Sequence, residues 1–232
     1  MLSALTFLTV LGRSAPPDRR TFRWFPVVGA GLGAAVGGVH LGVHRLWPPL
    51  VAGVVVVAAD LILTGALHLD GLADSADGLL VHADRPRRLA LMAEPGIGVF
   101  ALAAGGVVLL ARWALLTDPD IELLSLVALW AVSRTLAASV PAFVRYARRG
   151  GLAEPFLSGS RHWLLAWLAP AGAGLFLLEG ARGPIALGVA LATGALIAAV
   201  AHRRLGGFTG DVLGAVIMLS ETAALLTLVA SP

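Results

Sequence analysis

The chain has no cysteine and no lysine, so all 17 of its basic residues are arginine. The absence of cysteine excludes disulfide bonds, thiolate catalysis and cysteine-based metal sites. The isoelectric point near 10.9 therefore reflects arginine alone. Because the arginines lie mostly in short segments between apolar runs, no nucleic-acid-binding surface is expected.

Charge of either sign is scarce. Charged residues make up 13% of the 232 residues, whereas soluble globular domains contain about a quarter. Hydrophobic residues make up 58%, and mean hydropathy is +0.86. Several windows of about 20 residues are nearly free of charge, which is the length of a transmembrane helix. The chain is therefore expected to be all-α, a polytopic membrane helical bundle with a single integral-membrane domain over residues 1–232.

About seven transmembrane helices are expected from the apolar runs. Their ranges are 25–47, 49–68, 97–117, 121–144, 162–179, 184–201 and 212–230. Residues 1–12 are apolar but too few to span, so a short interfacial helix is expected there. No basic region precedes this segment and no small-residue cleavage site follows it, so we expect it to be retained rather than removed as a signal peptide.

The distribution of arginine predicts which side of the membrane each loop faces. The N-terminal segment and the loops at 69–96, 145–161 and 202–211 would share one side, and they hold 13 of the 17 arginines. The opposite loops hold only Arg45 and Arg182, together with an acidic turn at 118–122. By the positive-inside rule, the arginine-rich side is cytoplasmic.

Three carboxylates gather in residues 68–78, in the polar segment that follows the second expected span. Asp70, Asp74 and Asp77 would lie within an arc of roughly 60° if this stretch is helical. Clustered carboxylates repel one another unless a positive charge lies among them, although a solvated turn would tolerate them. Carboxylate oxygens suit magnesium, calcium or manganese, so a Mg²⁺ site at the membrane surface is expected.

Two neighbouring features suit a phosphate-bearing substrate. His68 adjoins the aspartates and has three open interpretations: a general base, a phosphate ligand or a packed interfacial histidine. Residues 205–215 carry Gly207, Thr209, Gly210 and Asp211 at the start of a span, where backbone amides can bind phosphate. The alternative is a flexible connection in which Asp211 caps the helix. An aspartate or His68 would take the proton from an attacking hydroxyl.

Polar residues within the spans have structural alternatives. Arg134 and Glu221 lie mid-span, where they would either pair with each other or, for Arg134, face a substrate. Asp60 has no assigned role, and Arg112 is expected to extend outward to the interface. The Gly29, Gly33 and Gly37 series on the first span predicts close helix packing.

The motifs resemble a known family, the cobalamin (5'-phosphate) synthases, also called adenosylcobinamide-GDP ribazoletransferases. The resemblance is carried by Thr-Gly-Ala-Leu-His-Leu-Asp-Gly-Leu-Ala-Asp-Ser-Ala-Asp-Gly at 64–78, Leu-Gly-Gly-Phe-Thr-Gly-Asp-Val-Leu-Gly-Ala at 205–215, and shorter pieces at 5–9, 25–29 and 133–134. One segment departs from the family pattern Met-Lys-Asp-x-Arg-Ile-Gly, reading Met-Ala-Glu-Pro-Gly-Ile-Gly at 92–98. Glu94 keeps the carboxylate there, and Arg87 or Arg88 would substitute for the family arginine that Gly96 replaces.

The resemblance implies a late step of cobalamin biosynthesis. The 3'-hydroxyl of α-ribazole, or of its 5'-phosphate, would attack the cobinamide-linked phosphorus of adenosylcobinamide-GDP, releasing GMP with Mg²⁺ required. It implies Asp70, Asp74, Asp77 and Glu94 as metal ligands, and His68, Asp74 and Asp77 as catalytic residues. The expected substrate-binding residues are Arg87, Arg88, Arg134, Gly207, Thr209, Gly210 and Asp211. A homo-oligomer is left open, and the expected location is the bacterial cytoplasmic membrane with the site facing the cytoplasm.

Two alternative functions fit the sequence less well. A CDP-alcohol phosphotransferase pattern reads Asp-Gly-x-x-Ala-Arg, and this chain has Asp74 where that arginine is expected. A transporter would use Asp60, Arg134 and Glu221 to line a path, which would leave the clustered aspartates without a task.

Overall fold

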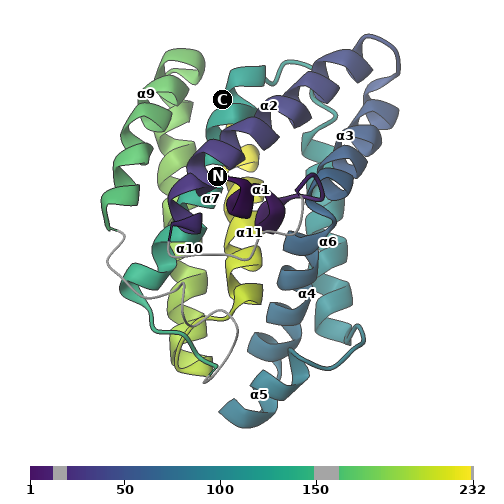
Figure 1. Ribbon diagram of the computed structural model, residues 1–232. Coiled ribbons are helices and arrows are strands. Elements are labelled where there is room, and N and C mark those ends of the chain that lie inside the picture. The colour runs from purple at the N-terminus through teal and green to yellow at the C-terminus, as the bar shows by residue number, and fades with distance from the viewer. Residues whose placement is uncertain (13–19, 149–161, 231–232) are drawn as a thin grey trace.

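The computed structural model describes residues 1–12, 20–148 and 162–230, and this part of the chain is a bundle of helices without a β-strand (Figure 1). The helices are α1 (Leu2–Leu8), α2 (Phe25–His44), α3 (Pro49–Thr64), α4 (Leu67–Leu80), α5 (Arg85–Leu91), α6 (Val99–Leu115), α7 (Leu123–Phe143), α9 (Leu168–Glu179), α10 (Arg182–Leu205) and α11 (Gly210–Val229). Two 3₁₀ helices, η1 (Thr21–Trp24) and η2 (His162–Trp167), lead into α2 and α9.

The all-α membrane bundle is confirmed, and each of the seven predicted ranges contains helix. Five helical segments are long and apolar enough to cross a membrane: 21–44, 123–143, 162–179, 182–205 and 210–229. The pair α3 and α4 adds a sixth if it is taken as one broken span, and the apolar helix α6 has 17 residues. Helix α1 has only seven residues, which is too few to span.

A sharp bend separates α3 from α4, which lie at 88° to each other. Gly65 and Ala66 both adopt left-handed backbone conformations, with φ of 60° and 55°, and so end one helix and begin the next. The prediction of one continuous span over 49–68 was therefore wrong at its end. The acidic stretch lies on helix α4 itself, not in a loop, because a new helix starts at Leu67.

Helices α7 and α11 form the buried centre of the bundle, whereas α9 is largely exposed on its outer side (Figure 1). The predicted glycine face on α2 packs against α7. A Cβ atom at Gly29 would lie 2.5 Å from the Trp130 carbonyl oxygen, and one at Gly33 would lie 2.6 Å from the Leu126 carbonyl oxygen. The glycines therefore allow the two backbones to approach closely.

Replacing Gly33 by alanine should destabilise the fold. The added methyl group would force α2 away from α7, at a cost of about 1–3 kcal/mol in the free energy of unfolding. Gly31 is the matched control, because a Cβ atom there meets nothing within 4 Å. Thermal unfolding in detergent should show a lower Tm for Gly33→Ala but not for Gly31→Ala. Equal effects of the two substitutions would contradict the close packing.

Candidate functional site

The three aspartates of α4 form an acidic face that meets Asp211 at the start of α11. Asp74 is partly buried, and this burial is the main reason that its pKa rises to about 6. The Asp211, Asp70 and Asp77 carboxylates raise the pKa further, and the guanidinium of Arg148 opposes them. Three carboxylates and only one guanidinium therefore act on Asp74, so the site favours an additional cation or proton.

Two glycines bring the acidic segments of α4 and α11 together. A Cβ atom at Gly71 would lie 2.8 Å from the Asp211 carbonyl oxygen and 3.2 Å from the Gly214 Cα atom. A Cβ atom at Gly214 would lie 3.2 Å from the His68 carbonyl oxygen. The two stretches that stood out in the sequence, 68–78 and 205–215, therefore pack backbone against backbone.

A cavity of about 120 Å³ opens beside this contact, between α1, α2, α4 and α11. Its apolar wall includes Phe7, Leu8 and Phe25, and its polar wall includes His68, Asp70 and Asp211. The rest of the lining is Leu67, Gly71, Gly210, Leu213, Gly214 and Ile217. The structure thus brings His68 and two of the predicted acids to one cavity.

Asp77 has a contact that the sequence did not predict. Its carboxylate accepts hydrogen bonds from the backbone amides of Gly98, at 2.7 Å, and Ala101, at 3.0 Å, and so caps the N-terminus of α6. In the described part of the chain, no group of three or more His, Asp and Glu side chains is arranged to hold a metal ion. The hard oxygen donors suit Mg²⁺, which typically uses one or two carboxylates together with substrate phosphates rather than an all-protein cage.

The residues expected around Gly96 have other partners. Glu94 lies 2.5 Å from Arg87 in an exposed ion pair, so both side chains are turned to each other. Arg88 donates hydrogen bonds to the carbonyl oxygens of Gly78, Leu79 and Ala83, and so closes the C-terminal end of α4. The structure describes no contact between these three side chains and the carboxylates of α4.

The glycine loop is held by the segment that follows α7. Phe208 and Tyr146 form an isolated parallel β-bridge. The amide of Ala147 donates to the Phe208 carbonyl oxygen at 2.8 Å, and the amide of Phe208 donates to the Arg145 carbonyl oxygen at 2.9 Å. A Cβ atom at Gly207 would collide with the Arg145 carbonyl oxygen. The glycine there allows this close approach.

Thr209, not Asp211, is the N-cap of α11. Its hydroxyl oxygen accepts a hydrogen bond from the Val212 amide, and the hydroxyl donates to the Asp211 carboxylate at 3.1 Å. Asp211 lies in the first turn and is 3.2 Å from the guanidinium of Arg148. Arg148 was missed in the sequence, where it resembled any other positive residue of a cytoplasmic loop.

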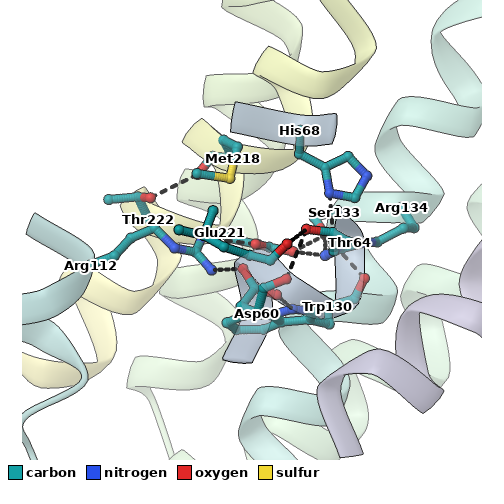
Figure 2. A network of polar contacts seen from close by, with 11 residues as sticks. Asp60, Thr64, His68, Arg112, Trp130, Ser133, Arg134, Met218, Glu221 and Thr222 are labelled. Atoms are coloured by element: carbon teal, nitrogen blue, oxygen red, sulfur yellow. Dashed lines mark hydrogen bonds and ion pairs between the residues drawn. The ribbon is translucent and has the colours of Figure 1, made fainter. Parts of the chain in front are cut away.

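A buried network of charges lies behind the cavity (Figure 2). Arg112 contacts Asp60 at 2.8 Å and Glu221 at 2.9 Å, and Arg134 also pairs with Glu221. Trp130 donates a hydrogen bond to Asp60 at 3.0 Å. The charges of two arginines and two acids therefore balance inside the bundle. Of the two alternatives for Arg134, pairing with Glu221 or facing a substrate, the structure shows the pairing.

The expectation that Arg112 extends outward was wrong. Its side chain is 1% exposed, because Asp60 and Glu221 provide two buried carboxylates within reach. Asp60, to which the sequence analysis assigned no role, is thus a buried ion-pair partner of Arg112. His68 borders this network, with its Nδ1 atom 3.5 Å from Nη2 of Arg134.

These features define a class: an integral membrane protein with an acidic, partly apolar cavity built by two sequence-distant motifs. Comparison with known proteins narrows the class. The family model described as cobalamin-5-phosphate synthase matches residues 1–229, so the chain belongs to this family and is a transferase of cobalamin biosynthesis.

Similar curated proteins carry the name adenosylcobinamide-GDP ribazoletransferase. The protein from Chlorobium phaeobacteroides is 37% identical, covering 91% of this chain and 88% of the relative. The protein from Chlorobaculum tepidum is 38% identical, covering 97% of this chain and 91% of the relative. The protein from Ectopseudomonas mendocina is 35% identical, covering 98% of this chain and 97% of the relative. No solved structure matches the chain.

Removing Glu221 should destabilise the protein strongly. Glu221→Gln leaves two buried arginines facing a single carboxylate, which we expect to cost about 3–5 kcal/mol in the free energy of unfolding. Glu94→Gln is the matched control, since it breaks an exposed pair worth about 0–1 kcal/mol. Denaturation in detergent measures both, and a Glu221→Gln protein as stable as the control would contradict the role of the network.

Proposed function

We propose that the chain is a Mg²⁺-dependent transferase that joins adenosylcobinamide-GDP to α-ribazole or its 5'-phosphate, giving adenosylcobalamin or its 5'-phosphate and GMP. The observation that carries the proposal is the cavity that Asp70 of α4 shares with Gly210 and Asp211 at the start of α11, where the two segments pack backbone against backbone. Support also comes from the shared name of the relatives over nearly their whole length.

The acids have distinct environments, which suggests distinct roles. Asp70 is exposed and Asp74 partly buried on the open acidic face, and these two carboxylates would hold Mg²⁺. Asp77 would join them only after leaving the amides of Gly98 and Ala101. The metal, when bound, would neutralise charge on the diphosphate oxygens. Asp211 also lines the cavity and is not one of these metal ligands, so its carboxylate would accept the proton of an attacking hydroxyl there.

The bonding changes follow from an in-line attack at phosphorus. The acceptor oxygen forms a bond to the cobinamide-linked phosphorus, the bond from that phosphorus to the bridging oxygen breaks, and the electron pair leaves with GMP. Arg148 borders the acidic face through its ion pair with Asp211, and its guanidinium would contact a substrate phosphate there. Arg87, Arg88 and Glu94 would take part only after leaving their present partners.

The active site is proposed to face the cytoplasm of a bacterial cytoplasmic membrane. The α4–α5 end of the bundle carries the arginines of α5 and of the last turn of α10, and the α2–α3 connection lies at the opposite end (Figure 1). The transporter alternative loses its basis, because the mid-span charges pair with one another.

Asp74→Asn should remove activity without unfolding the protein. We expect GMP release from adenosylcobinamide-GDP, α-ribazole and Mg²⁺ to fall by roughly 100-fold, because a ligand carboxylate is lost. The pKa of Asp74 is raised in the fold, so its ionised form costs stability at pH values above about 6, and neutral Asn should leave the Tm equal or higher. Asp120→Asn, in the exposed turn before α7, is the control. Full turnover by Asp74→Asn, or no GMP release by the unaltered protein, would contradict the proposal.

Cysteine labelling can test the orientation, since the natural chain contains no cysteine. Ala93→Cys lies at the α4–α5 end and Leu46→Cys, at a residue 72% exposed, lies at the other end. In intact cells, a membrane-impermeant maleimide should label the Leu46→Cys protein and spare the Ala93→Cys protein. The reverse pattern would place the acidic site outside the cytoplasm.

A further inference from the structure

A second hollow in the bundle is a groove of about 430 Å³ between α7, η2, α10 and α11. It shares no lining residue with the acidic cavity. Apart from Ser139 and His202, its lining is apolar, and the Ser139 hydroxyl already donates to the Thr135 carbonyl oxygen at 2.7 Å. The groove therefore presents hydrocarbon to its occupant, which suits an apolar chain.

Small side chains on α10 create the groove. Gly194, Ala195, Ala198 and Ala199 lie on one face of this helix, where larger side chains would fill the space. Ala195 and Ala199 are exposed, so the groove opens on the outside of the bundle. Because α10 is long and apolar enough to cross a membrane, the groove faces the acyl chains of the bilayer.

Basic groups lie at one end of the groove, in the last turn of α10. His202 lines the groove, and Arg203 follows Ala199 by four residues, so it extends the same row of side chains by one turn. Arg203 is exposed and makes no hydrogen bond or ion pair with the described residues, whereas Arg204 donates to the Leu79 carbonyl oxygen. A guanidinium is thus available for an anion at this end of the groove.

Two tryptophans indicate the level of the membrane interface. Trp163 and Trp167 are 55% and 43% exposed on η2, on either side of Leu165, which lines the groove. Exposed tryptophan is enriched where the hydrocarbon region meets the lipid headgroups. The groove therefore runs from the hydrocarbon region to the headgroup level, as a phospholipid does.

The charge of the groove distinguishes between headgroups. Among the described residues, no acidic side chain lines it, so the ammonium group of a zwitterionic headgroup would find no carboxylate there. A phosphate near His202 and Arg203 would find hydrogen-bond donors and a positive charge. Basic pockets between transmembrane helices are typical binding sites for anionic lipid headgroups.

We propose that this groove binds one anionic phospholipid, with an acyl chain along the alanines of α10 and the phosphate against Arg203. The site is separate from the acidic cavity and does not depend on the reaction proposed above.

Native mass spectrometry of the full chain in an uncharged detergent tests the proposal. The protein is titrated with palmitoyl-oleoyl phosphatidylglycerol and with phosphatidylcholine that carries the same two chains. We expect one phosphatidylglycerol molecule to bind about fivefold more tightly than phosphatidylcholine, since one arginine at a membrane surface contributes about this factor. Equal affinities for the two lipids would overturn the anionic site.

Arg203→Gln should remove this preference and leave the two affinities within about twofold of each other. Arg182→Gln is the matched control, because it alters an exposed arginine at the other end of the same helix. The control should keep the preference of the unaltered protein. A preference that persists in Arg203→Gln, or that falls equally in both variants, would overturn the role of Arg203.

Ala199→Leu should fill the groove and weaken the binding of phosphatidylglycerol by about tenfold or more, because contacts with several methylene groups are lost. Ala192→Leu is the control, at an exposed alanine of α10 that does not line the groove. Equal binding by these two variants would overturn the groove as the site. A dimer of the unaltered protein that Ala199→Leu dissociates would overturn it as well, by assigning the groove to a second copy of the chain.

Thermal unfolding checks that each variant is folded. If Ala199→Leu does not fold, the unaltered protein and Arg203→Gln, at an exposed position, still test the site. GMP release is measured in none of these experiments, so the lipid site and the proposed function can fail separately.

Discussion

The balanced network of Asp60, Arg112, Arg134 and Glu221 is the interaction on which the bundle depends. Its members come from α3, α6, α7 and α11, so four helices are fixed relative to one another by hydrogen-bonded ion pairs. Removing a charge from water is costly, and inside a bilayer no solvent can replace a lost partner. The same network orients His68, and so links the centre of the bundle to the cavity wall.

Much of the fold was predictable because membrane helices follow length and hydropathy. The spacing of Asp70, Asp74 and Asp77 also predicted a shared face, and helix α4 provides it. The bend at Gly65 and Ala66 was not predictable, since an alanine in a left-handed conformation has no sequence signature. Arg112 was misplaced because its two partners lie 52 and 109 residues away along the chain.

The arginines at the acidic end show why the site was only partly predictable. Arg88, which the sequence predicted to bind substrate, instead donates to main-chain carbonyls at the end of α4. Arg85 likewise donates to Ala147, and Arg145 to Gly206. They hold the loops in place, and Arg148 remains as the described partner of Asp211. Positive charge counted in a sequence gives the side of the membrane, but not the groups that a substrate will meet.

The glycine contact between α4 and α11 has a thermodynamic consequence. Because Gly71 and Gly214 let the two main chains touch, the distance between the two acidic segments depends on backbone packing and little on side-chain rotamers. A ligand that bridges the segments therefore meets a preorganised frame, and less of its binding free energy is lost to conformational entropy. A methyl group at either position would push the two helices apart. It would thereby change the distance between the two acidic segments without altering any polar group.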